Sequence, residues 1–207
     1  MIDEMLKRHR LISDQVDEKE LRVILRELLI VLESGIVGDI VEFGCYKGTT
    51  SLFLARVLEK FNSDKKLFLY DSFAGLPEKT VQDNSRVGDD FKAGELLATK
   101  ADLIKNFRKE NLPMPVIRKA WFGDLTDRDV PPQICFAFFD GDFYESIRDS
   151  FRVCERYFSP GATIVVDDYQ NEALPGASKA TDEWLYKNSA RVKNFRIEQS
   201  LGIIHLR

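Results

Sequence analysis

Histidine and cysteine are scarce in this chain, and their scarcity excludes several kinds of site. The chain has three cysteines and two histidines, His9 and His205, among 207 residues. Cys45, Cys135 and Cys154 are far apart and form no C-x-x-C pair, so we expect neither a structural zinc site nor a disulfide framework. Two of the cysteines lie in apolar runs, which indicates buried, reduced thiols.

Long apolar runs and an excess of one charge are also missing. The longest apolar run near the N-terminus, residues 28–32, is too short to span a bilayer, and the residues before it are too charged for a signal peptide. A net charge of −4 gives no general attraction for nucleic acid or an anionic membrane. We therefore expect a cytoplasmic protein with no nucleic-acid or membrane partner, for which a homodimer is a possible assembly.

What the chain does contain is a regular alternation of helical and strand-like segments. Its length and its 44% hydrophobic content suit one α/β domain. Helical spacing or composition predicts helices over residues 17–33, 50–61, 95–110, 144–158 and 178–187. Apolar runs predict strands over residues 40–43, 67–70, 116–117, 134–139 and 162–166, and near 195–197 and 202–206.

This alternation predicts an α/β fold with a doubly wound, mostly parallel, seven-stranded sheet in a single domain over residues 1–207. The run 134–139 is apolar throughout, as expected of a strand covered on both faces. The last two strands are joined by a turn that is too short for a crossover, so they should form an antiparallel hairpin at one edge. We expect residues 1–35 to form a helical segment that packs on the core or covers it as a lid.

Acidic residues follow nearly every strand that looks central. In open α/β sheets, ligands bind at the carboxyl ends of the strands, so this pattern predicts a site at that edge. The acidic residues in question are Glu42, Asp71, Asp140, Asp142, Asp167 and Asp168.

The first strand and the second strand end in residues that suit a nucleoside. Gly44 and Gly48 would let the backbone approach a ligand before the next helix, although a plain turn explains them equally well. The loop is neither G-x-G-x-x-G nor a P-loop. Asp71 is placed to accept hydrogen bonds from a ribose diol. S-adenosylmethionine fits such a site because it has a ribose but no pyrophosphate, and Glu42 would attract its amino group.

The four later aspartates predict a cation site. Asp140, Asp142, Asp167 and Asp168 would repel one another unless protons or a cation neutralise them. Oxygen donors with no histidine or cysteine partner favour magnesium or a similar divalent ion. In the alternative interpretation some of these residues only cap helices, with Asp142 capping the helix that begins at Tyr144.

Five motifs follow one another between about Ile40 and Trp184: VEFGCYKGTT, YDSFAGLPE, FFDGDFYES, SPGATIVVDDY and PGASKATDEW. Together they resemble the macrocin O-methyltransferase (TylF-like) family, whose members methylate sugar hydroxyls in macrolide and aminocoumarin antibiotics. The resemblance implies a class I, Rossmann-like methyltransferase fold and magnesium bound by Asp140, Asp167 and Asp168. It also implies Asp142 as the general base and Asp71 as the ribose ligand.

The resemblance has two departures. Family members carry a longer N-terminal region that helps to form a lid, and their G-W-F-x-D-T-L block is AWFGDLT here, which keeps Trp121, Phe122 and Asp124. Trp121, Phe122, Tyr144 and Tyr169 are candidates for pocket walls, and equally for plain core residues. The predicted cofactor-binding set is Glu42, Gly44, Gly48, Thr49, Asp71, Ser72, Phe122, Asp124 and Asp140.

The sequence thus predicts an S-adenosylmethionine-dependent O-methyltransferase that acts, with a divalent metal, on a hydroxyl of a sugar-like or vicinal-diol small molecule. A catechol-type, metal-dependent methyltransferase of small phenols is the nearest alternative, since it shares the fold and a metal-bound diol. A haloacid-dehalogenase-like phosphatase also uses D-x-D and D-D, but its D-x-D strand opens the core domain, whereas Asp140 comes late in this chain. A non-enzymatic binding module would have no need for Asp142 beside the metal ligands.

Overall fold

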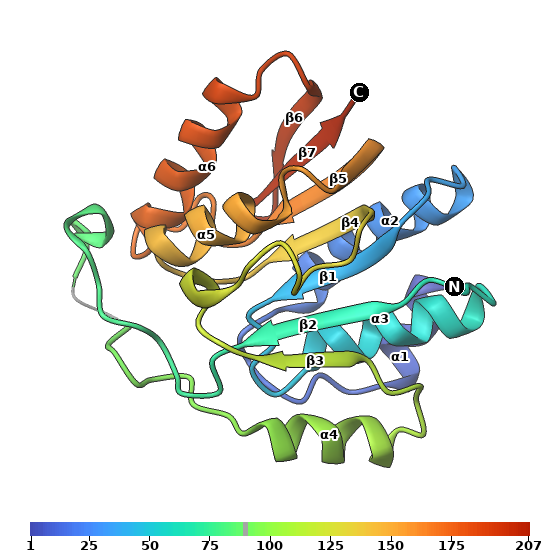
Figure 1. Ribbon diagram of the computed structural model, residues 1–207. Coiled ribbons are helices and arrows are strands. Elements are labelled where there is room, and N and C mark those ends of the chain that lie inside the picture. The colour runs from blue at the N-terminus through green and yellow to red at the C-terminus, as the bar shows by residue number, and fades with distance from the viewer. Residues whose placement is uncertain (89–90) are drawn as a thin grey trace.

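A mostly parallel sheet forms the centre of the protein (Figure 1). The computed structural model describes residues 1–88 and 91–207, and in these residues seven strands follow the order β3-β2-β1-β4-β5-β7-β6. Strands β1 to β5 are parallel, and β7 runs antiparallel to both β5 and β6. The predicted fold class and the edge hairpin are therefore confirmed. The strands are β1 (Asp39–Phe43), β2 (Leu67–Asp71), β3 (Val116–Lys119), β4 (Ile134–Phe139), β5 (Phe158–Val166), β6 (Val192–Glu198) and β7 (Leu201–Leu206).

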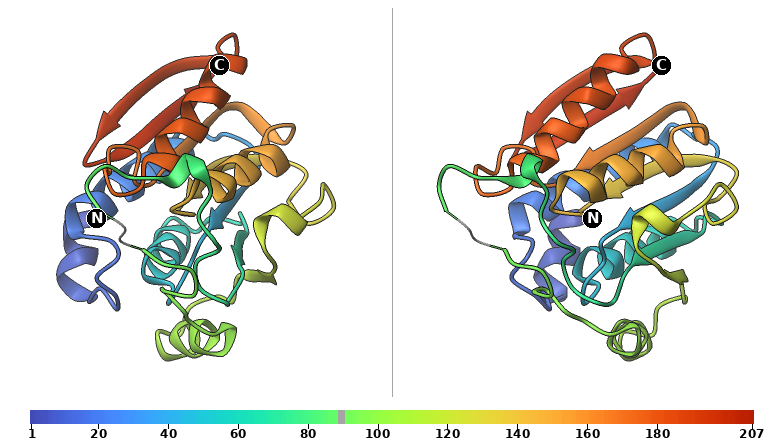
Figure 2. Two further views of the ribbon diagram at one scale, coloured as in Figure 1. Left: turned by 90° about the vertical axis from the view of Figure 1, so that its left-hand side faces the viewer. Right: turned by 60° about the vertical axis from the view of Figure 1, so that its left-hand side comes forward.

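Helices cover both faces of the sheet. Successive side chains of a strand point to opposite faces, and apolar side chains lie on both faces here, so each face needs a covering layer. Ile40 of β1 packs with the helices of the first half of the chain, whereas Val41 packs with α5 and α6. Figure 2 shows these two layers from the side. The α-helices are α1 (Ile2–Arg8), α2 (Glu18–Glu33), α3 (Thr49–Lys60), α4 (Lys100–Lys109), α5 (Tyr144–Cys154) and α6 (Pro175–Lys187). Two short 3-10 helices are η1 (Val81–Asp83) and η2 (Phe122–Asp124).

A buried carboxylate attaches α2 to the edge hairpin. Glu27 is fully buried and accepts a hydrogen bond from Nη2 of Arg196 at 2.5 Å, and its Oε2 lies 2.8 Å from Nε2 of His205. A buried carboxylate without partners would be strongly destabilising, so these contacts fix α2 against β6 and β7. His205 therefore has a structural role far from the carboxyl ends of β1 and β4.

The boundary between α5 and β5 differs from the prediction. The helix ends at Cys154, not at residue 158, and β5 begins at Phe158 and continues through Pro160 and Gly161. The pairing of β4 with β5 shifts register between Ile134 and Phe136, which makes room for these residues. Proline lacks an N–H donor, and here it precedes the part of β5 that pairs with β7.

The three cysteines are free and buried, as predicted. Burial raises the pKa of the Cys154 thiol well above its usual value, which keeps it unreactive. None of the helices that the structure describes combines the length and the apolar character needed to cross a membrane.

Candidate functional site

The central strands end in register, and this register brings their acidic residues to one level. Phe43 of β1 pairs with Phe139 of β4, which pairs with Val166 of β5. The ladder continues one residue further: the Asp140 N–H donates to the Phe43 carbonyl and the Asp167 N–H donates to the Phe139 carbonyl, both at 2.8 Å. The predicted clustering of acidic residues at the carboxyl edge therefore follows from strand pairing.

A cavity of about 370 Å³ opens at this edge. Many of the predicted site residues line it, and some do not. Those that line it are Gly44, Asp71, Ser72, Phe122, Asp140, Asp142 and Asp168. Glu42, Gly48, Thr49, Asp124 and Asp167 lie outside the lining.

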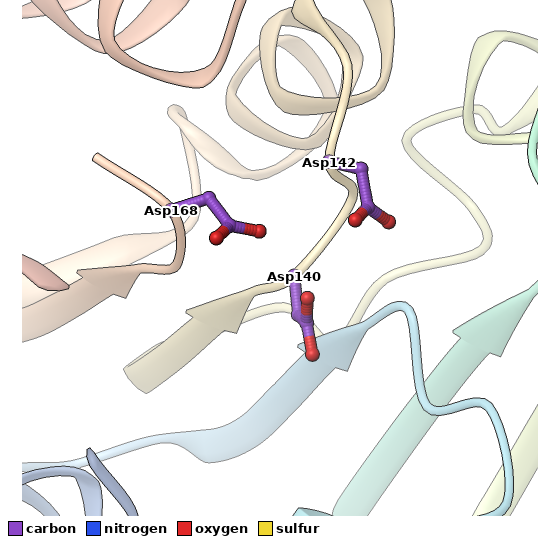
Figure 3. Close-up of side chains that lie close together, drawn as sticks. All are labelled: Asp140, Asp142 and Asp168. Atoms are coloured by element: carbon purple, nitrogen blue, oxygen red, sulfur yellow. The ribbon is translucent and has the colours of Figure 1, made fainter. Parts of the chain in front are cut away.

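Three aspartates on the cavity wall lie close together (Figure 3). Asp140 follows β4, Asp142 lies in the turn before α5 and Asp168 follows β5, and one carboxylate oxygen of each lies within 4.8 Å of those of the other two. Asp142 and Asp168 reach this position with left-handed backbone, at φ values of 59° and 56°. Aspartate adopts this conformation more readily than most residues. We call Asp140, Asp142 and Asp168 the carboxylate cluster.

Burial and mutual repulsion disfavour the charged forms of this cluster. Burial and, after it, the charges of Asp168 and Asp71 together raise the pKa of Asp142 to about 8. The pKa of Asp140 is raised well above its usual range, first by burial and then by the charges of Asp167 and Asp142. Among the described residues that line the cavity, none is lysine, arginine or histidine. The cluster is thus short of positive charge.

Asp167 lies outside the carboxylate cluster. Its carboxylate accepts the N–H of Asp168 at 2.9 Å. Burial raises the pKa of Asp167 well above its usual value, and the charges of Asp168 and of Glu20 on α2 add to this effect. The side chain continues the alternation of β5 toward the α2 face, because Val165 packs on that face. The predicted ligand set Asp140, Asp167 and Asp168 thus differs from the cluster that the structure forms, and metal binding by Asp167 stays a prediction.

Asp142 does not cap α5. That helix has no side-chain cap from Phe143, the residue at its N-cap position; the N–H of Tyr144 instead donates to Oδ1 of Asp83 at 2.7 Å. The cap comes from a distant part of the chain, so the alternative in which Asp142 is a helix cap is wrong. Its carboxylate is left to face the cavity. Thr80 and Asp83 also form a capping box on their own short helix, η1.

Asp71 holds the two loops that form one side of the cavity. Its Oδ2 accepts the N–H groups of Cys45 and Tyr46 at 3.0 and 2.9 Å, and its Oδ1 accepts that of Phe73 at 2.7 Å. The residue also lines the cavity, where the predicted ribose would lie. The structure thus gives Asp71 an organising role that the sequence pattern did not reveal.

Glu42 lies in the middle of the sheet and is 1% exposed. Its Oε2 has no hydrogen-bond partner among the described residues. Burial, together with a smaller contribution from the charge of Asp71, raises the pKa of Glu42 to about 8. A buried oxygen without a donor is what a ligand amino group would satisfy, so the predicted contact to a cofactor amino group stays a prediction.

Gly44 is required by the strand packing itself. Its φ is 85°, and a Cβ atom built on it would lie 1.7 Å from the carbonyl oxygen of Asp140. The close approach that the sequence predicted is therefore to a neighbouring loop backbone. Gly48 has φ of 90° and precedes α3, where the hydroxyl of Thr49 lies 2.6 Å from that of Ser13.

Two of the four candidate aromatic walls reach the cavity. Trp121, which is 42% exposed, and Phe122 line it. The hydroxyl of Tyr144 donates to Glu183 and that of Tyr169 donates to Asp182, and neither residue lines the cavity.

Several lining residues were missed by the sequence analysis. Asn171 donates from Nδ2 to Oδ1 of Asp168 at 2.8 Å, which orients one member of the carboxylate cluster. Asp14 and Gln15 bring the segment between α1 and α2 to the cavity, so part of the N-terminal region forms its wall. No motif marked these residues, because their role depends on where the chain returns to the sheet.

The sheet order, the single antiparallel strand β7 and the cavity at the carboxyl ends define a class I, Rossmann-like methyltransferase fold. The solved structure of the O-methyltransferase NovP has this architecture: it is 24% identical, with a TM-score of 0.77 over 92% of this chain and 81% of that one. The macrocin-O-methyltransferase (TylF) family matches residues 13–200. The chain belongs to this family.

Two curated relatives indicate the chemistry within the family. A tetracenomycin-pathway enzyme of Streptomyces olivaceus, 8-demethyl-8-(2,3-dimethoxy-alpha-L-rhamnosyl)-tetracenomycin-C 4'-O-methyltransferase, is 30% identical over 71% of this chain and 59% of its own length. Mycinamicin III 3''-O-methyltransferase of Micromonospora griseorubida is 26% identical over 74% of this chain and 62% of its own length. The chain spans about three fifths of the length of each.

Proposed function

We propose that the protein is an S-adenosylmethionine-dependent O-methyltransferase that acts on a hydroxyl of a sugar-like small molecule. Family membership and the two relatives, both named for O-methylation, support the reaction class. The observation that carries the proposal is the carboxylate cluster, which faces the same cavity as the loops held by Asp71. A methyl donor and a hydroxyl acceptor would meet between them.

The residues present fit the methyl donor. Asp71 and Ser72 offer oxygen atoms to a ribose, and no phosphate-binding loop competes for that position. The partnerless Oε2 of Glu42 would accept a hydrogen bond from the amino group of the donor. When bound, S-adenosylmethionine would supply the methyl group.

The carboxylate cluster also fits a magnesium ion. Three half-buried carboxylates with raised pKa values form a set of hard oxygen donors that a divalent cation would neutralise. Asp140 and Asp168 would hold the ion, and Asp167 is the further predicted ligand. When bound, the ion would lower the pKa of a neighbouring acceptor hydroxyl.

Asp142 is the residue that would take the acceptor's proton. Its carboxylate faces the cavity, and burial and neighbouring charges raise its pKa to about 8. A divalent cation bound beside it would favour the deprotonated form, which is the form that can act as the general base. The Asn171 amide would keep Asp168 oriented beside it. Trp121 and Phe122 would wall the cavity against water.

Calorimetric titration with S-adenosylmethionine, with and without magnesium, tests this proposal. We expect binding of the methyl donor, followed by methyl transfer to a rhamnoside acceptor that requires a divalent cation. Transfer to catechol but not to any glycoside would favour the catechol-type enzyme. A chain that binds no donor at millimolar concentration would refute the proposal and bring back the phosphatase alternative.

Asp71→Asn should weaken donor binding. The new Nδ2 group cannot accept a hydrogen bond, so at least one loop N–H loses its partner, and the ribose loses a charged acceptor. Loss of one charge-assisted hydrogen bond is worth roughly 1.5–3 kcal/mol, or about 10- to 150-fold in Kd. Asp39→Asn is the matched control, because Asp39 accepts the Lys66 N–H at the opposite end of β1. Equal Kd values in both variants would show that Asp71 has no role in binding.

A further inference from the structure

The turn formed by residues 80–83 connects the segment after β2 to the start of α5. Asp83 is 1% exposed, and both of its carboxylate oxygens are used. Oδ2 accepts the N–H and the hydroxyl of Thr80 at 2.9 and 2.8 Å, and Oδ1 accepts the N–H of Tyr144 at 2.7 Å. One side chain thus joins the segment after β2 to the first residue of α5.

The start of α6 is shaped around the same carboxylate. A Cβ atom built on Gly176 would lie 1.9 Å from Oδ1 of Asp83, so only glycine leaves room for it. Lys179 of α6 donates to the carbonyl of Gln82, and Ser85 donates to the carbonyl of Glu172 at 2.7 Å. Figure 2 shows η1 lying against α6.

The chain on either side of this turn forms a wall of the cavity. Leu76 before the turn and Leu96 after it both line the cavity, and both belong to a small apolar cluster with Phe143. Phe143 is 1% exposed and directly follows Asp142. The cavity wall and the turn that carries Asp142 therefore pack against each other, and Asp83 bonds to both sides of this contact through Thr80 and Tyr144.

We infer that Asp83 is a positioning residue, which couples the cavity wall to Asp142. The inference deepens the proposed function and rests on it. Asp142 keeps its left-handed backbone only while Phe143 and Tyr144 are held on its C-terminal side. Without Asp83 the buried N–H of Tyr144 loses its acceptor and the first turn of α5 loosens. The proposed base and the wall then lose their fixed relation to the acceptor.

Asp83→Ala and a matched control, Asp129→Ala, test this role. Asp129 accepts the N–H and hydroxyl of Thr126 at 2.9 and 2.8 Å, which reproduces the Thr80 contacts without a cap on another helix. We expect Asp83→Ala to lower kcat/KM for the acceptor about 100-fold, because small displacements of reacting groups have effects of that size. The Kd for S-adenosylmethionine should change less than about 3-fold, since Asp71 at the end of β2 and Gly44 directly after β1 take no part in the hydrogen bonds of Asp83. Amide hydrogen exchange over residues 141–147 should accelerate.

Two further variants separate positioning from general loss of stability. Asp83→Asn should recover only part of the acceptor activity, because its single amide oxygen can accept the N–H of Tyr144 or that of Thr80 but not both. Gly176→Ala should reproduce the defect with Asp83 intact, because the added methyl group would lie 1.9 Å from the Asp83 carboxylate and 2.6 Å from the backbone nitrogen of Tyr144, and so would break the contact between them.

The outcomes are distinct. A wild-type chain that binds no methyl donor would overturn the proposed function and this role together. An active wild type whose kcat/KM is unchanged in Asp83→Ala would overturn only the role of Asp83, as would equal losses in Asp129→Ala.

Discussion

Asp142→Asn is expected to lower kcat by about 10²–10⁴-fold, because the amide cannot accept the acceptor's proton. The substitution should leave the fold and the affinity for S-adenosylmethionine unchanged. Asparagine tolerates the left-handed backbone at φ of 59° about as well as aspartate does. The helix that follows is capped by Asp83, so α5 does not depend on the Asp142 side chain.

The comparison with Asp168→Asn makes this prediction specific. Asp168 would hold the metal ion, so its variant should need more magnesium, and raising the magnesium concentration should restore part of its activity. No magnesium concentration should restore Asp142→Asn. Steady-state kinetics over a magnesium series, with circular dichroism as the check on folding, would measure both. Normal turnover in Asp142→Asn would mean that another group takes the proton.

The parts of the site that follow from strand order could be predicted from the sequence. Asp140 and Asp167 each come directly after an apolar run, and parallel pairing carries both to the same level at the sheet edge. Asp71 was recognised for the same reason. A strand end and its polarity are local properties of the sequence, and ligands of parallel α/β sheets bind at the carboxyl ends of the strands, so the cavity's position was predictable.

The parts that depend on side-chain direction or on distant contacts could not be predicted. Asp167 and Asp168 are adjacent, yet the left-handed backbone of Asp168 turns only the second carboxylate into the cluster. The cap of α5 comes from Asp83, 61 positions earlier in the chain. Pro160 lies inside β5 because a register shift accommodates it, whereas its residue type indicated a break. Each of these features is set by tertiary packing, which the local pattern does not encode.

Gly44 connects the fold to the site more directly than any other residue, and Gly44→Ala should be severely destabilising. Its φ of 85° costs an L-residue about 1–2 kcal/mol. The added Cβ would also lie 1.7 Å from the Asp140 carbonyl oxygen, a backbone atom that cannot turn away as a side chain can. Overpacking of this kind adds about 1–3 kcal/mol, so the free energy of unfolding should fall by about 2–5 kcal/mol in total.

Gly35→Ala provides the control for backbone conformation alone. Gly35 has φ of 64° after the end of α2, and nothing lies within 4 Å of the position of its Cβ. Its variant should lose only about 1–2 kcal/mol in urea unfolding. Any Gly44→Ala protein that does fold must separate the loops after β1 and β4, which carry Asp71's backbone partners and the first member of the carboxylate cluster. It should therefore have lost S-adenosylmethionine binding as well. Equal stability of the two variants would show that β1 and β4 can part at this edge without cost, and that Gly44 serves only to make the turn.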